Sequence, residues 1–169
     1  ILLACGASPI MSDEPKEAEE ITAICGGLNI NIGTLNKSSI EGMFRAGRRA
    51  ASLGHILLLD PVGAGASRLR TDTAIQLMEQ ISFDVIRGNI SEMKALANGS
   101  KTTKGVDANA ADAVTEEDLE AAVTFAKTFA KKAGCMVALT GALDLVSDGE
   151  ACYVIRNGRA EMGKITGTG

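Results

Sequence analysis

Short apolar runs alternate with amphipathic segments along most of the chain, and this alternation constrains the fold more than any other feature. The run from Ile56 to Leu59 is apolar throughout, which is typical of a strand buried on both faces of a parallel sheet. The segments between such runs carry apolar residues at helical spacing and end in glycine-bearing turns. The sequence therefore predicts a three-layer α/β fold, with a mainly parallel sheet and helices on both faces.

Local signals add detail to this prediction. Ser38-x-x-Glu41 predicts a capping box at the start of one helix. Asp148-Gly149 lies between two apolar runs and predicts a hairpin that adds antiparallel strands at one edge of the sheet. The expected strands are 28–32, 56–59, 84–87, 136–139, 143–147 and 151–155, and the expected helices are 14–24, 38–54, 71–80, 91–97 and about 115–134.

Composition argues against several classes of function. The chain has 169 residues with 17 Lys and Arg against 21 Asp and Glu, and so lacks the basic excess of nucleic-acid-binding proteins. Aromatic residues make up 3%, too few for platforms that stack bases. Cys5, Cys25, Cys135 and Cys152 are scattered and His55 is the one histidine, which argues against zinc. We expect a cytoplasmic protein with reduced cysteines and neither a nucleic-acid nor a membrane partner.

Polar residues stand where predicted parallel strands end, and ligands bind beyond the carboxyl ends of such strands. Asp60, Arg87 and Thr140 occupy three such positions, each followed closely by glycine. A guanidinium suits phosphate and a carboxylate suits Mg²⁺ or its waters, so this set fits a metal-bound phosphate ligand. Two alternatives stay open: Asp60 as a turn cap before Pro61, and Arg87 as half of a surface ion pair.

Two further features have two interpretations each, and Met11 and the cysteines have one. Glu92, three residues after Asn89, either stabilises the first turn of a helix or points toward Mg²⁺. The segment 166–169, Thr-Gly-Thr-Gly, either offers backbone N–H groups to a phosphoryl oxyanion or is a plain loop. Met11 taken alone is typical of a core residue, and the cysteines are typical of core residues rather than nucleophiles.

Several segments together resemble the hydroxyethylthiazole kinase family of the ribokinase-like superfamily. They occur in the family's order along essentially the whole chain, and the most specific is Asp-Pro-Val-Gly-Ala-Gly-Ala at 60–66 together with Ile-Arg-Gly-Asn at 86–89. The others are Gly-Ala-Ser-Pro-Ile-Met at 6–11, Asn-Ile-Gly-Thr-Leu at 31–35, Glu92, Thr-Gly at 140–141 and Thr-Gly-Thr-Gly at 166–169. The resemblance implies an enzyme that uses ATP and Mg²⁺ to phosphorylate the hydroxyl of 4-methyl-5-(2-hydroxyethyl)thiazole in thiamine biosynthesis and salvage. It also implies a homotrimer with the thiazole site between subunits.

The resemblance also implies roles for individual residues. The family's catalytic cysteine would directly follow Gly169, so we expect no catalytic residue within the chain. We expect one truncated ribokinase-like kinase domain over residues 1–169, an internal fragment lacking both ends, with low activity by itself. The implied roles are thiazole binding for Met11 and Gly167, ATP binding for Arg87 and Thr140, Mg²⁺ binding for Asp60 and Glu92, and an anion hole made by Gly167, Thr168 and Gly169.

Three other functions remain as alternatives. One is another ribokinase-like kinase, acting on a hydroxymethylpyrimidine or a sugar. A second is an ATP- or ADP-dependent hydro-lyase that repairs a damaged nicotinamide cofactor on the same kind of sheet. The third is a catalytically inactive scaffold that binds nucleotide without turning it over.

Overall fold

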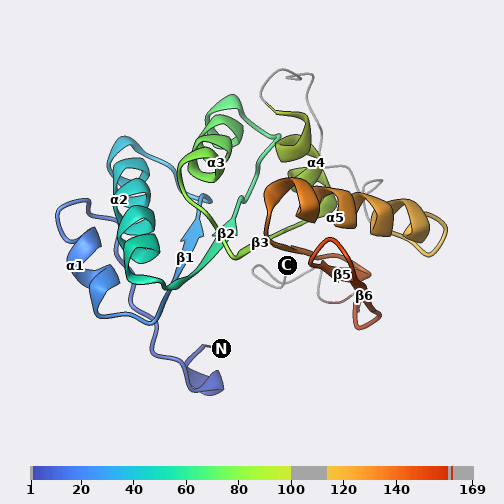
Figure 1. Cartoon of the computed structure of the whole chain (residues 1–169), viewed down its shortest axis with the longest axis horizontal. Coiled ribbons are helices and arrows are strands. Elements are labelled where there is room, and N and C mark those ends of the chain that lie inside the picture. The colour runs from blue at the N-terminus through green and yellow to red at the C-terminus, as the bar shows by residue number, and fades with distance from the viewer. Residues whose placement is uncertain (1, 100–113, 160, 162–169) are drawn as a thin grey trace.

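A six-stranded sheet forms the centre of the molecule in the computed structural model, which describes residues 2–99, 114–159 and 161 (Figure 1). The strands lie side by side in chain order, from β1 to β6. Strands β1 to β4 are parallel to one another, and β5 and β6 are antiparallel. This confirms the predicted mixed α/β sheet with its antiparallel edge. The strands are β1 Gly27–Asn31, β2 Ile56–Asp60, β3 Val85–Gly88, β4 Met136–Leu139, β5 Asp144–Ser147 and β6 Cys152–Ile155.

Two of the helices begin at side-chain caps that were not predicted from the sequence. Asn36 accepts a hydrogen bond from the Ser39 N–H while the Ser39 hydroxyl accepts one from the Asn36 N–H, so the predicted capping box at Ser38 and Glu41 is wrong. Ser67 caps the next helix, which therefore begins three residues before its predicted start. The helices are the 3₁₀ turn η1 Leu3–Cys5, α1 Ala18–Ala23, α2 Lys37–Leu53, α3 Arg68–Gln80, α4 Ile90–Asn98 and α5 Leu119–Ala133.

The strand register divides the sheet into two unlike faces. On one face Leu57, Leu59 and Ile86 join a single buried core, while Leu58 and Val85 point to the opposite face and stay outside it. Right-handed connections between strands added in one direction place their helices on the same face. The helical layer accordingly contributes to this one core, through Ala50 of α2, Leu77 of α3, Met93 of α4 and Phe129 of α5.

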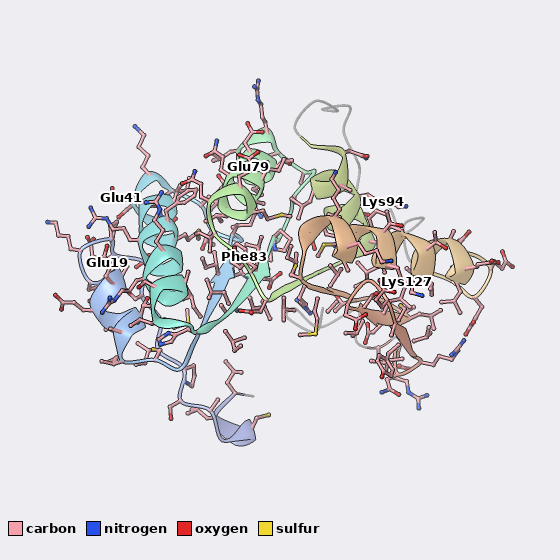
Figure 2. The ribbon with its side chains drawn as sticks, in the orientation of Figure 1. Glu19, Glu41, Glu79, Phe83, Lys94 and Lys127 are labelled. Carbon is pink, nitrogen blue, oxygen red and sulfur yellow. The ribbon has the colours of Figure 1, made fainter. Side chains whose placement is uncertain are left out.

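The helical layer presents its polar side to solvent. Glu41 on α2 and Glu79 on α3 point outward, whereas Phe83 lies buried next to the sheet (Figure 2). Helix α1 packs on α2 at the edge of the layer (Figure 1). Of the helices in the described part of the chain, none is long and apolar enough to cross a membrane.

The two faces of β2 make different contributions to stability. Leu59 is fully buried, so Leu59→Ala should lower the free energy of unfolding by about 2–5 kcal/mol. Leu58 is half-buried outside the core, so Leu58→Ala should cost clearly less, because less apolar surface returns to water. Urea unfolding of both variants measures the difference. Equal losses would show that both faces of β2 are packed to the same degree.

Candidate active site

The carboxyl ends of the first three strands bring an amide, a carboxylate and a guanidinium together. Asn31 and Asp60 are paired in register at the last positions of β1 and β2. The Asn31 Nδ2 donates a hydrogen bond of 2.7 Å to Asp60 Oδ2, and Arg87 Nη1 lies 3.6 Å from the same oxygen. The side chain of Asp60 is 13% exposed and that of Arg87 is 33% exposed. The carboxylate is therefore largely shielded from water, while the guanidinium remains open to a ligand.

This geometry shows which contacts are made by the two residues whose interpretation was left open. The Asp60 side chain contacts Asn31 and Arg87, while the turn after β2 is closed by the Asp60 backbone carbonyl, which accepts a bond from the Val62 N–H. Arg87 does form an ion pair, but its partner is Asp60 at the strand ends. Both are strand-end residues predicted from the sequence, and the structure places them next to each other.

Thr140 lies at the same edge of the sheet, one residue beyond β4. Its N–H donates a 2.9 Å hydrogen bond to the carbonyl of Gly88, the last residue of β3. The next residue, Gly141, donates its N–H to the carboxylate of Asp144 at 2.9 Å. The backbone around Thr140 is thus held against the end of the strand that carries Arg87.

The loop after Asp60 is a series of tight turns that requires glycine. The Ala64 N–H donates to the Pro61 carbonyl and the Ala66 N–H donates to the Gly63 carbonyl. Gly63 has φ of 74° and Gly65 has φ of 93°, values that side-chain-bearing residues rarely adopt. The glycines that the sequence analysis noted therefore have a direct conformational role beside Asp60.

Glu92 joins this loop to the start of α4. Its Oε2 accepts a 2.9 Å bond from the Asn89 N–H, and the Asn89 side chain in turn accepts from the Glu92 N–H at 2.8 Å. Its Oε1 accepts a 2.8 Å bond from the Gly63 N–H. The predicted role of Glu92 in the first turn of α4 therefore accounts for the contact of one carboxylate oxygen, Oε2. The other oxygen, Oε1, holds the loop that follows Asp60.

Two residues of this region were missed by sequence reasoning. Arg70, in the first turn of α3, donates to the carbonyls of Gly33 and Val62 at 2.8 Å each. Asn31 is the last residue of β1, which ends one residue before the predicted strand 28–32 does, so the strand-end rule applied to Asp60 finds Asn31 only once this boundary is known. For Arg70 the signal is weaker, namely a cation in a first helical turn, where the helix dipole disfavours positive charge.

The remaining predicted residues lie elsewhere. Met11 is 94% exposed before α1, so the interpretation of Met11 as a core residue is wrong. Gly167, Thr168 and Gly169, predicted to form the anion hole, lie outside the described residues.

Burial, with a smaller contribution from the nearby Asp84 charge, raises the pKa of the Cys135 thiol to about 11. Cys135 is consequently a protonated, poor nucleophile at neutral pH.

Individual carboxylates, rather than a cluster of ligands, are what the described residues offer to a metal ion at the carboxyl ends of the strands. Within residues 2–99, 114–159 and 161, no group of three or more histidine, cysteine, aspartate or glutamate side chains gathers around one point. Mg²⁺ does not need such a group, because it commonly binds one or two carboxylates together with water and phosphate oxygens. Asp60 and Glu92 both flank the glycine loop and are the carboxylates suited to it.

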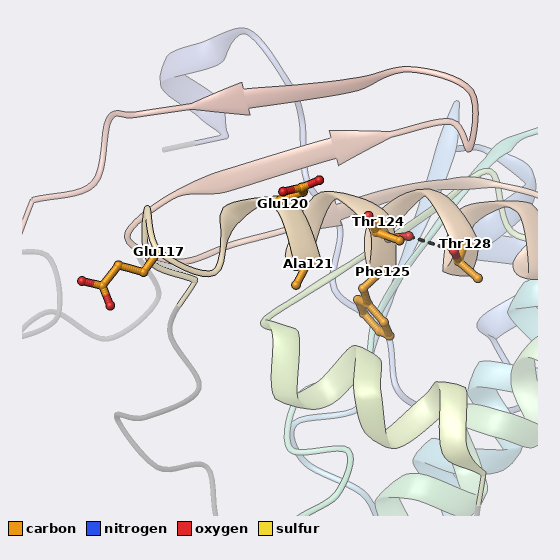
Figure 3. A pocket seen from close by; sticks show the side chains of 6 residues that line it. All are labelled: Glu117, Glu120, Ala121, Thr124, Phe125 and Thr128. Carbon is orange, nitrogen blue, oxygen red and sulfur yellow. Dashed lines mark hydrogen bonds between the residues drawn. The ribbon is translucent and has the colours of Figure 1, made fainter.

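A separate hollow lies on the outer side of α5 and is not part of this site. It has a volume of about 650 Å³ and opens widely to solvent beside α4 (Figure 3). None of the strand-end residues lines it. Its lining residues are Glu117, Glu120, Ala121, Thr124, Phe125 and Thr128.

Comparison with known proteins first defines the class of fold. The structure of adenosine kinase from Sinorhizobium meliloti covers 87% of this chain with a TM-score of 0.54 and 17% sequence identity, which shows a ribokinase-like fold. The structure of the hydroxyethylthiazole kinase protein from Pyrococcus horikoshii is more similar. It covers 98% of this chain with a TM-score of 0.83 and 35% identity, and the match takes in 59% of that protein.

Sequence comparison then gives the family. The model of the hydroxyethylthiazole kinase family matches residues 1–169, and the chain belongs to this family. The hydroxyethylthiazole kinases of Clostridium acetobutylicum and Clostridium beijerinckii are 57% and 49% identical to it over all 169 residues. The chain spans 62% and 60% of the lengths of these two relatives.

The dual contact of Glu92 makes Glu92→Gln a test of how the glycine loop is held. A neutral amide can accept one of the two backbone bonds but presents N–H to the other donor, so unfolding free energy should fall by about 1–3 kcal/mol. The amide of Gly63 should also exchange its hydrogen faster. Urea unfolding and hydrogen exchange measure the two effects.

The matched control is Glu79→Gln on the exposed side of α3, which should change neither quantity. If Glu92→Gln behaves like this control, Glu92 does not hold the loop.

Proposed function

We propose that this chain carries the strand-end part of a kinase that transfers the γ-phosphate of ATP to the hydroxyl of 4-methyl-5-(2-hydroxyethyl)thiazole. The observation that carries the proposal is the cluster of Asn31, Asp60 and Arg87 at the carboxyl ends of parallel strands, in a chain that matches the family from 1 to 169. Phosphoryl transfer requires mainly positioning and electrostatic stabilisation, and these are what such a cluster supplies.

ATP is assigned to Arg87 and Thr140. The Arg87 guanidinium is 33% exposed and shares its charge with Asp60 across 3.6 Å, so it retains donors for phosphate oxygens. Thr140 follows the neighbouring strand, and its backbone is tied to Gly88 directly after Arg87. Both residues would hold the phosphates at the sheet edge, where the glycine loop begins.

Magnesium is assigned to Asp60 and Glu92. Asp60 Oδ2 is engaged by Asn31, while no described residue donates a hydrogen bond to Oδ1, which suits a hard cation. The Glu92 carboxylate accepts one N–H bond at each oxygen and keeps further lone pairs. When bound, Mg²⁺ neutralises charge on the phosphate oxygens during transfer.

The remaining parts of the proposal concern substrate, assembly and location. Met11 and Gly167 would contact the thiazole, and Gly167, Thr168 and Gly169 would form an anion hole for the transferring phosphoryl group. The nearly full exposure of Met11 supports a role outside the core. We further propose one kinase domain over residues 1–169, a homotrimer with the thiazole site between subunits, and a cytoplasmic role in thiamine biosynthesis. The catalytic cysteine would directly follow Gly169.

The test compares two forms of the protein. One is the 169-residue chain, and the other is a completed version in which the chain replaces the matching 62% of the Clostridium acetobutylicum relative. With ATP, Mg²⁺ and thiazole alcohol, the completed version should form thiazole phosphate, whereas the chain alone should bind nucleotide with little turnover. Coupled ADP release and chromatography of the phosphorylated product measure the activity.

A substitution at the proposed site provides the internal control. In the completed version Asp60→Asn should reduce kcat by about 100-fold or more, in line with the loss of a preorganised electrostatic group. Asp148→Asn should leave activity unchanged, because Asp148 lies in the β5–β6 turn and an amide can still accept its backbone bonds. Phosphorylation of a pyrimidine alcohol or a sugar in preference to thiazole would overturn the proposed substrate.

A further inference from the structure

The Arg70 guanidinium connects the loops that follow two neighbouring strands. Its Nη2 donates to the carbonyl of Gly33, two residues beyond β1, and its Nη1 donates to the carbonyl of Val62, two residues beyond β2. Each bond is 2.8 Å long, and both acceptors are backbone carbonyls. A planar guanidinium can span two such acceptors at once, whereas the single ammonium of lysine cannot reproduce this fork.

A second pair of hydrogen bonds continues from Gly33 to Asp60. The Gly33 N–H donates to Asn31 Oδ1 at 2.8 Å, and Asn31 Nδ2 donates to Asp60 Oδ2 at 2.7 Å. Because a backbone N–H can only donate, it fixes which end of the Asn31 amide is the oxygen. The NH₂ group must then face the Asp60 carboxylate, which accepts its hydrogen bond.

The two glycines in this path permit the close approach. A Cβ added to Gly33 would lie 2.9 Å from Asn31 Oδ1, and one added to Gly63 would lie 2.7 Å from Arg70 Nη1. Residues with side chains at these positions would push the amide or the guanidinium away. The glycines thus serve the hydrogen-bond path as well as the turn geometry.

We propose that Arg70 is a positioning residue that orients the Asp60 carboxylate through a relay formed by Arg70, Gly33 and Asn31. Its second bond, to Val62, holds the backbone two residues after Asp60, so the carboxylate is constrained from both sides. The relay keeps Oδ2 engaged and presents Oδ1 in one orientation. For its catalytic consequence this inference rests on the proposed function, in which Asp60 serves the phosphate and its metal ion.

The test uses variants at the two ends of the relay in the completed version of the protein. Arg70→Gln and Asn31→Ala should each lower kcat by about 10- to 100-fold, the size expected when a reacting group is misplaced by about an ångström. The KM for thiazole alcohol should change little, because neither side chain is assigned to that substrate. Arg70→Lys should recover only part of the loss.

The double variant gives the sharpest result. Groups that act through one path are not additive, so Asn31→Ala combined with Arg70→Gln should be little worse than the more damaging single change. Arg68→Gln and Asn29→Ala are the matched controls: Arg68 lies in the same helical turn, and Asn29 lies on the same face of β1, and both are exposed. Both controls should retain kcat. Fully additive losses, or wild-type kcat in Arg70→Gln, would overturn the relay.

Hydrogen exchange separates failure of the relay from failure of the proposed function. In the 169-residue chain, Arg70→Gln and Asn31→Ala should each speed exchange at the Gly33 amide, while the two controls should not. This readout needs no activity. If the completed protein lacks kinase activity but Gly33 responds as stated, the proposed function fails and the relay stands. An unchanged Gly33 amide in both variants would overturn the relay.

Discussion

The hydrogen bond between Asn31 and Asp60 is the contact on which the site depends. It exists because β1 and β2 are parallel and in register, so their last residues are neighbours on one face of the sheet. A shift of one residue in that register would turn one of the two side chains to the opposite face. The buried residues of the strands specify the register, since Ile30 and Leu59 must both reach the core. Packing of the core therefore determines which side chains meet at the carboxyl ends of β1 and β2.

The two faces of the sheet have different functions. One face, with Leu57, Leu59 and Ile86, is buried beneath the helical layer and stabilises the fold through apolar packing. Asn31, Asp60 and Arg87 belong to the other face, at its carboxyl end. Strand alternation thus separates the residues that stabilise the sheet from those assigned to the ligand.

Much of this arrangement could be predicted from the sequence. Hydrophobic alternation indicated all six strands and their mixed topology, and the strand-end rule selected Asp60 and Arg87 from their positions alone. Helix starts were less predictable, because Asn36 and Ser39 compete with the equally plausible pair Ser38 and Glu41, and tertiary context decides between them. The roles of the strand-end residues rest on family resemblance and on geometry together.

Contacts between distant segments could not be predicted from local patterns. Arg70 is 37 residues from Gly33, and Glu92 is 29 residues from Gly63, so no periodicity links either pair. Glu92 illustrates the difference. Its role as a helix cap was visible in the spacing Asn-x-x-Glu, whereas its bond to the glycine loop forms only when β2 and β3 are placed side by side. The loop is consequently held from two directions, by Glu92 and by Arg70.

In the proposed function, phosphate and its metal ion bind at the carboxyl ends of β1 to β4. Paramagnetic broadening of backbone amide signals by Mn²⁺ with ADP, measured on the completed protein, tests it most directly. Binding there should broaden the signals of Gly33, Gly63 and Gly88 strongly and leave those of His55 and Gly134 unchanged, because these two residues precede β2 and β4 at the amino ends of the strands. Broadening centred on the amino ends of the strands, or on the hollow beside α5, would contradict it.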